Sequence, residues 1–167
     1  MKLDNKLFKN LKKKNVNFIT IDGITCSGKS LFAELLKKNL KSYYREVYIL
    51  SKDLFLYPRT KRIKISKNIN RSKFNQNNLH YDIKKLKIFI NFLIGKSKLK
   101  TFKMSNLYNR KSGKNDRTIR IKFLKNRLII FEGIYVNQDI SFLKKSTFKI
   151  LLIEKVYESL SRKIQRI

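Results

Sequence analysis

The sequence predicts an α/β fold in three layers, with helices on both sides of a mostly parallel central sheet. Short apolar runs typical of buried strands alternate with segments whose apolar residues recur at helical spacing. Such alternation indicates a parallel sheet, because parallel strands are joined by crossover helices. Polar and charged side chains follow several of the strand candidates. Ligands of parallel sheets bind beyond the carboxyl ends of the strands, so the same pattern predicts where a site would lie.

The first half of the chain contains two strand candidates and one helix. Residues 16–22 alternate apolar and polar side chains and are rich in β-branched types, which predicts a strand. A helix is expected from Ser30, because apolar residues then recur at helical offsets. These are Leu31, Leu35, Leu36 and Leu40. Residues 46–50 form a short apolar run and are expected to be the second strand.

The second half adds a loop, two helices and two strands. Residues 58–78 are polar, basic and rich in Asn, and are expected to form a long loop. Ile83, Leu86, Ile90 and Leu93 predict a helix over 82–93. Residues 128–131 and 148–153 are apolar runs expected to be buried strands. The last segment, 156–167, is expected to be a basic helix.

Length and composition argue for one domain. The 167 residues suffice for one sizeable core, and neither a repeat nor a linker rich in Gly, Ser or Pro divides them. We expect a single domain over 1–167, with a basic lead-in at 1–15 and a substrate-side insertion at 58–126.

The single cysteine, Cys26, cannot form an internal disulfide, and no stretch is apolar enough for a signal peptide or a membrane span. A cytoplasmic location is therefore expected.

The formal net charge of +30 has two interpretations. A strongly basic protein can bind nucleic acid or an anionic membrane. Alternatively, an A/T-rich genome would enrich Lys, Asn, Ile, Phe and Tyr together, and Ala33 is the only alanine. The lysines are spread along the chain, which favours the second interpretation. We expect a small-molecule substrate, with no membrane or nucleic-acid partner, and leave assembly into a homo-oligomer open.

Residues 23–30, GITCSGKS, match the phosphate-binding loop G-x-x-x-x-G-K-[ST] at each fixed position. Gly23 and Gly28 let backbone amides approach phosphates closely, Lys29 reaches the β- and γ-phosphates, and Ser30 ligates Mg²⁺. A short motif can match by chance, but here a strand precedes it and a helix follows. We therefore expect a P-loop fold with ATP and Mg²⁺ as cofactors. The expected nucleotide contacts are Gly23, Ile24, Thr25, Cys26, Ser27, Gly28, Lys29, Ser30 and Leu31.

Two carboxylates follow strand candidates. Asp53 comes just after the second strand, where it can accept a proton from an attacking hydroxyl and help to hold the metal. Alternatively, Asp53 is a helix N-cap. Glu132 directly follows residues 128–131 and can hold Mg²⁺, directly or through water. Its alternative is a solvated charge at a strand end.

Together these segments resemble the uridine kinase and phosphoribulokinase group of P-loop kinases, over most of the chain from about Phe18 onward. The resemblance rests on residues 23–30, 51–53, Phe55, Tyr57, 129–134 and 160–166. It implies that Asp53 is the general base for a sugar hydroxyl and that Glu132 supports Mg²⁺. It also implies that the helix containing Arg162 and Arg166 supplies cations to the transferring phosphate.

The acceptor side departs from the family pattern. Leu79 stands where the family's Asp-His-Pro-like segment begins with Asp, so His80 or Asp82 could take its role; a lone His is more often structural. Tyr108 and Arg110 resemble the segment that contacts the nucleoside, although a core tyrosine and a solvated turn explain them equally well. The expected substrate contacts are therefore Tyr57, His80, Asp82, Tyr108 and Arg110.

The cationic helix ends at residue 167, where the family continues into a lid, another strand and a closing helix. We therefore expect a fold that is incomplete at its C-terminal end, and low turnover if no lid follows. The expected function is ATP- and Mg²⁺-dependent phosphorylation of a hydroxyl on a nucleoside, such as uridine, or on a ribose-type sugar. Lys29, Arg162 and Arg166 would neutralise charge in the transition state. The alternatives are a P-loop kinase for another small molecule, a lid-less ATP-binding protein with little catalysis, or a nucleic-acid binder.

Overall fold

The computed structural model describes residues 10–11, 16–68, 79–93, 101–122, 126–139 and 147–153. The chain divides into two compact units. The first combines Met1–Ser51 with Leu124–Ile167, and the second is Lys52–Phe123. Most of the second unit falls within the insertion expected at 58–126, and the single-domain expectation stays a prediction.

The first unit contains a parallel sheet of four strands in the order β2-β5-β1-β6. The strands are β1 (Phe18–Gly23), β2 (Glu46–Ser51), β5 (Arg127–Gly133) and β6 (Thr147–Leu152). Every residue of β1 is buried, as are six of the seven in β5. Strands buried on both faces read as nearly continuous apolar runs, which is why the sequence revealed them. The predicted α/β fold with a mostly parallel central sheet is confirmed.

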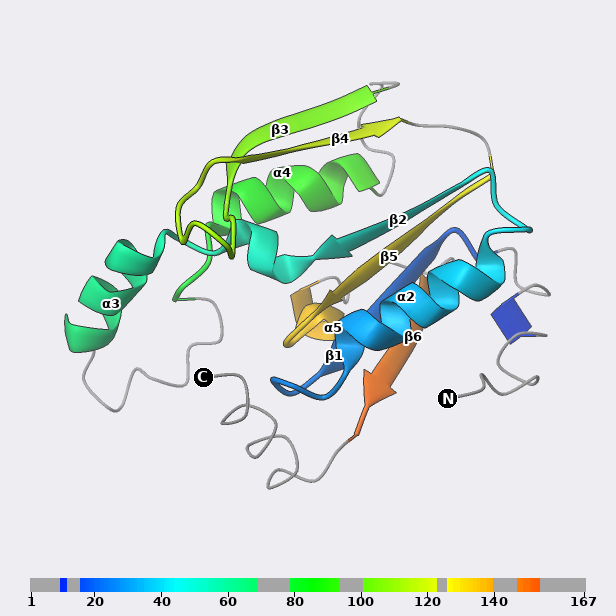
Figure 1. Cartoon of the computed structure of the whole chain (residues 1–167), viewed down its shortest axis with the longest axis horizontal. Coiled ribbons are helices and arrows are strands. Elements are labelled where there is room, and N and C mark those ends of the chain that lie inside the picture. Colours follow the sequence, from blue (N-terminus) through cyan, green and yellow to red (C-terminus); the bar gives the residue numbers. More distant parts are fainter. Residues whose placement is uncertain are drawn as a thin grey trace. The chain divides into compact units, whose positions relative to one another are not determined.

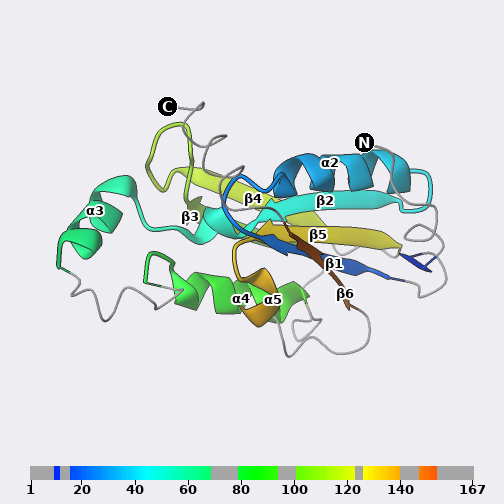
Figure 2. The same cartoon turned by 90° about the horizontal axis from the view of Figure 1, so that it is seen from below.

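Helices lie on both faces of this sheet. Helix α2 (Lys29–Leu40) covers one face and the short helix α5 (Val136–Asp139) lies on the other (Figure 2). The core between α2 and the sheet includes Leu36, Leu40, Ile19 and Ile130, each at most 1% exposed.

One residue of the expected apolar face of α2 was wrongly placed. Leu31 is 74% exposed, whereas Phe32, Ala33, Leu36 and Leu40 are buried. A helix turns by about 100° per residue, so Leu31 lies nearly opposite Ala33 and Leu40. The leucine pattern indicated the helix correctly, but the buried stripe is centred on other positions.

The second unit packs a helix against a hairpin. It begins with a 3₁₀ helix, η1 (Lys52–Phe55), and contains α3 (Arg59–Asn68), α4 (Ile83–Leu93) and the antiparallel strands β3 (Thr101–Leu107) and β4 (Arg117–Lys122). Helix α4 runs alongside the hairpin (Figure 1). Aromatic rings fill the space between them: the Phe89 centroid lies 5.1 Å from that of Phe55 and 5.8 Å from that of Phe102. The helix predicted over 82–93 is confirmed.

Two features of this unit differ from the expectation or were missed. Residues 59–68, expected as loop, form α3; the Arg62 N–H donates to the Pro58 carbonyl at 3.0 Å. Helix α3 buries none of its residues, so it lacks the apolar periodicity that would have predicted it. Its Lys and Arg residues nevertheless have good helix propensity, and proline is tolerated at a helix start.

The hairpin β3–β4 was not predicted because charged residues interrupt its few buried positions.

The helix expected at 156–167 and most of the lead-in at 1–15 lie outside the described residues. Among the helices that are described, none is long and apolar enough to cross a membrane.

A matched pair of leucines on α2 tests this packing. We expect Leu36→Ala to lower the free energy of unfolding by about 2–5 kcal/mol, because it leaves a cavity in the core. Leu31→Ala, on the exposed side of the same helix, should change it by no more than about 0.5 kcal/mol. Urea unfolding followed by circular dichroism measures both. Equal losses in the two variants would contradict the assigned face.

Candidate functional site

The turn between β1 and α2 requires both glycines of the phosphate-loop motif, for different reasons. A Cβ added to Gly23 would lie 2.7 Å from Ser27 Oγ and 2.8 Å from the Leu152 carbonyl oxygen, so a side chain cannot fit there. At Gly28 the space is open, but φ is +84°, a left-handed conformation that favours glycine. Cys26, with φ of +63°, shares that conformation. The chain therefore folds back tightly before α2 begins.

Helix α2 directs its N-terminal end into this turn. Its N-cap, Gly28, has no side chain to cap the first amides, and the first turn contains no acidic residue. Lys37 and Lys38 lie in its last turn, where cations complement the helix dipole. No capping side chain occupies the positive end of the helix, so its first amide groups can donate hydrogen bonds to an anion.

Lys29 lies across the same turn. Its side chain is 9% exposed, and Nζ donates to the Ile24 carbonyl at 2.5 Å and to Ser27 Oγ at 3.4 Å. The ammonium group is therefore held at the turn and does not extend into solvent. A cation at this place adds its charge to that of the helix end.

Ser30 and Glu132, two of the predicted metal ligands, lie together. Ser30 Oγ donates to Glu132 Oε1 at 3.4 Å, although the residues are 102 positions apart. Glu132 is 7% exposed and lies on β5, between Ile21 of β1 and Ser51 of β2 in the sheet register. The parallel sheet thus brings a strand-end carboxylate to the first turn of α2.

The two side chains offer oxygen atoms of the kind that Mg²⁺ prefers. Within the described ranges, no group of three or more His, Cys, Asp or Glu residues could hold a metal ion. Mg²⁺ usually needs fewer protein ligands, because it keeps several waters and binds substrate phosphates. A hydroxyl and a carboxylate at the mouth of a phosphate loop provide such a set.

Asp22 is a structural residue of the site, although the sequence predicted it only as the last residue of a strand. It is 8% exposed. Its Oδ1 accepts the N–H groups of Gly23 at 2.7 Å and Tyr135 at 2.9 Å, and its Oδ2 accepts that of Asn137 at 3.1 Å. One carboxylate therefore ties the start of the phosphate loop to the turn that follows Glu132. A charged residue in a buried strand, directly before the first glycine, was the signal available in the sequence.

In the second unit, the backbone brings two groups of predicted substrate residues together. The Tyr57 N–H donates to the His80 carbonyl at 2.9 Å, and the Asp82 N–H donates to the Phe55 carbonyl at 2.7 Å. The segments around Tyr57 and His80 therefore run side by side. Asp53 lies in η1, at the start of the same unit.

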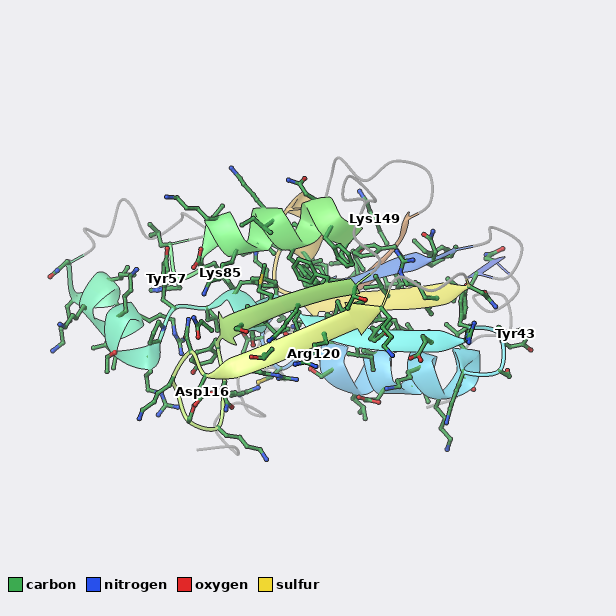
Figure 3. The ribbon with its side chains drawn as sticks, turned by 90° about the horizontal axis from the view of Figure 1, so that it is seen from above. Tyr43, Tyr57, Lys85, Asp116, Arg120 and Lys149 are labelled. Carbon is green, nitrogen blue, oxygen red and sulfur yellow. The ribbon has the colours of Figure 1, made fainter. Side chains whose placement is uncertain are left out.

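Two of the predicted substrate residues, Asp82 and Tyr108, make side-chain hydrogen bonds within the second unit. Asp82 caps α4, because its Oδ1 accepts the Lys85 N–H at 3.1 Å. Tyr108 is 5% exposed, and its hydroxyl accepts a hydrogen bond from Arg62 Nη2 at 2.7 Å. Arg110 is exposed in the turn before β4. Figure 3 marks Tyr57, Lys85 and Asp116 in this unit.

Arg162 and Arg166 lie outside the described residues. Lys52, which belongs to the segment 51–53 of the family resemblance but was given no role, is completely buried, and its Nζ lies 4.6 Å from the centroid of the Tyr81 ring. This cation–π contact joins η1 to the segment that carries His80.

The comparisons with known proteins establish the fold. No family model matches the sequence, and a search of the curated proteins finds no match. A solved structure described as a possible uridine kinase from Bacillus stearothermophilus aligns with a TM-score of 0.61 at 16% identity, over 93% of this chain and 85% of that one. The fold is that of P-loop kinases. A candidate fructose transport system kinase from Silicibacter sp. TM1040 aligns with a TM-score of 0.68 at 15% identity, over 96% of this chain and 79% of that one. The resemblance drawn from the sequence is thus confirmed at the level of the fold.

Asp22→Asn tests the anchoring of the loop. The new amide group presents hydrogens toward at least one backbone N–H, which then lacks an acceptor, so we expect a loss of about 1–3 kcal/mol in the free energy of unfolding. Hydrogen exchange should become faster at one or more of the amides of Gly23, Tyr135 and Asn137. Asp116→Asn is the control, because that carboxylate is exposed. Unchanged exchange at all three amides would refute the anchoring role.

Proposed function

We propose that this protein is a kinase that transfers the γ-phosphate of Mg·ATP to a hydroxyl group of a nucleoside or a ribose-type sugar. The observation that carries the proposal is the β1–α2 turn, where Lys29 crosses the loop and Ser30 lies 3.4 Å from Glu132. A cation, a helix N-terminus and a pair of metal-binding oxygens converge there. Phosphoryl transfer depends mainly on such positioning and charge neutralisation.

Each residue of the turn has a proposed task. The amides between Gly23 and Ser30 bind the phosphates of ATP, and Lys29 neutralises charge on the β- and γ-phosphates. Ser30 and Glu132 hold Mg²⁺, which when bound compensates the charge of the phosphate oxygens. Asp22 is a positioning residue that keeps the first glycine of the loop in place.

Asp53 is the proposed general base. Ser51, the last residue of β2, is paired with Glu132, and Asp53 follows it by two residues in the chain. In the proposed step the acceptor oxygen forms a bond to the γ-phosphorus while the bond to the β–γ bridging oxygen breaks. The proton of the acceptor hydroxyl passes to the Asp53 carboxylate. Asp53 would also contribute to holding the metal.

The acceptor class is taken from two sources. The sequence resembles uridine kinases, and one structural neighbour is described as a possible uridine kinase, the other as a candidate kinase of a fructose transport system. Both descriptions name small molecules with free hydroxyl groups. Tyr57, His80, Asp82, Tyr108 and Arg110 remain the proposed acceptor contacts, and Arg162 and Arg166 the proposed cations for the transferring phosphate.

A panel of nucleosides and sugars, with ATP consumption as the readout, tests the activity. We expect Mg²⁺-dependent ADP formation with at least one hydroxyl-bearing acceptor. ATP binding without turnover of any acceptor would favour a nucleotide-binding protein with little catalysis.

Lys29→Gln tests the phosphate loop. Loss of a charge-assisted contact should weaken Mg·ATP binding by about tenfold to a hundredfold, since such contacts contribute roughly 1.5–3 kcal/mol. Lys38→Gln, an exposed lysine in the last turn of the same helix, is the matched control and should leave the affinity unchanged. Isothermal titration calorimetry measures both. Equal weakening by the two variants would indicate only diffuse attraction by the positive net charge.

Asp53→Asn separates binding from chemistry. Removal of the general base should lower kcat by about 10²–10⁴-fold, which is more than the weakening of Mg·ATP binding that follows from the loss of its contribution to the metal site. Steady-state kinetics with the best acceptor, combined with calorimetry, give the two values. If kcat is unaffected, Asp53 is only an acidic residue in the first turn of η1 and has no catalytic role.

A further inference from the structure

Lys52, the first residue of η1, is a lysine with 0% exposure. Lysine is almost never fully buried unless its charge has a partner, because removing an ammonium group from water is costly. Its Nζ lies over the ring of Tyr81, 4.6 Å from the centroid, which is within the range of a cation–π contact. Such a contact is stronger when both groups are shielded from water. The Tyr81 ring is therefore one of the groups that compensate the buried charge.

Tyr81 is attached to the chain at both ends of η1. Its ring contacts Lys52 at the first position, and its backbone forms an isolated antiparallel bridge with Leu56, which directly follows η1. The Leu56 N–H in turn donates to the Asp53 carbonyl at 3.1 Å. Asp53 therefore lies in a single turn of chain that one residue holds at its beginning and at its end.

This short turn depends on contacts with the rest of its unit. A 3₁₀ helix of four residues has few internal hydrogen bonds, and their geometry is poorer than in an α-helix. Toward its C-terminal end, the Leu54 carbonyl accepts the Tyr108 N–H at 2.8 Å. At its N-terminal end, directly before Asp53, the side chain of Lys52 makes the attachment to Tyr81.

The burial of the residues around Asp53 fits a requirement of acid–base chemistry. Lys52 and Leu54 are buried, whereas Asp53 between them is half-buried. The two neighbours anchor the turn in the unit, and the side chain of Asp53 keeps access to solvent. A general base needs this combination, because it must reach a ligand hydroxyl and must do so in a fixed geometry.

We propose that Lys52 and Tyr81 form a clamp that positions Asp53 for its task as general base. This inference rests on the proposed function, in which Asp53 takes the proton of the acceptor hydroxyl. Lys52 is a positioning residue, since it acts on the reaction only through the placement of Asp53. Apolar side chains often replace buried ionic groups without loss of stability. Loss of activity without loss of stability is therefore the expected mark of this role.

Hydrogen exchange tests the clamp without any substrate. Lys52→Met should speed exchange at the Leu56 amide by about tenfold or more, because η1 opens more often when its first attachment is lost. The Gly113 amide, which is hydrogen-bonded elsewhere in the same unit, should exchange as in the wild-type protein. Lys84→Met, at an exposed position of α4, is the matched control and should leave both amides unchanged. Amide exchange followed by NMR gives these rates.

Steady-state kinetics test the consequence for catalysis. With the best acceptor, Lys52→Met should lower kcat by about tenfold to a hundredfold, since a displacement of about 1 Å in a catalytic group can cost that much. The midpoint of urea unfolding should stay near the wild-type value. Lys84→Met should change neither quantity. A fall in kcat that accompanies a lower midpoint would assign Lys52 a purely structural role and overturn the proposal.

Tyr81 provides a second, independent pair of variants. Tyr81→Leu removes the ring and should lower kcat as Lys52→Met does, whereas Tyr81→Phe keeps the ring and should retain most of the activity. The double variant Lys52→Met/Tyr81→Leu should lose no more than about threefold beyond either single change, because both remove the same contact. Fully additive losses would show that the two residues act separately. If Lys52→Met does not fold, the comparison of Tyr81→Leu with Tyr81→Phe decides the question.

The two readouts separate this inference from the proposed function. A wild-type protein that turns over no acceptor would refute the proposed function, and exchange at the Leu56 amide would still decide whether the clamp exists. Unchanged exchange in Lys52→Met would overturn the clamp. In an active protein, an unchanged kcat in Lys52→Met would overturn its role in positioning Asp53.

Discussion

The buried carboxylate of Asp22 fixes the position of the chain at the end of β1. Asp22 is 8% exposed and accepts three backbone N–H groups, from Gly23, Tyr135 and Asn137. Burial of a charge is costly unless hydrogen bonds replace those of water, and these three amides provide the replacement. The same contacts define the direction in which the phosphate loop begins. They also hold the turn that follows the strand of Glu132.

The parallel sheet then brings together residues that are far apart in the chain. Because β1, β2 and β5 run in the same direction, their carboxyl ends adjoin at one edge. The first turn of α2 starts at this edge, so Ser30 lies beside Glu132. The positive helix end and Lys29 add favourable charge for phosphates at the same place. The proposed chemistry therefore follows from the sheet geometry together with two glycines that permit a tight turn.

The sequence predicted the parts of the molecule that have strong local signals. Buried strands such as β5 are continuous apolar runs, and the phosphate loop needs glycine at Gly23 and Gly28 for steric and conformational reasons. Helix α3 was missed because it lies on the surface and has no apolar stripe. The role of Asp22 was missed because two of its three partners are backbone amides more than a hundred residues away, and residue types do not reveal such contacts.

We propose that the backbone amides of the turn after β1 bind the phosphates of ATP. The most direct test is a titration of ¹⁵N-labelled protein with Mg·ATP, followed by amide chemical shifts. We expect the largest shifts at residues 24–30, with saturation at one equivalent. Shifts concentrated elsewhere, or no change at these amides despite binding, would contradict it.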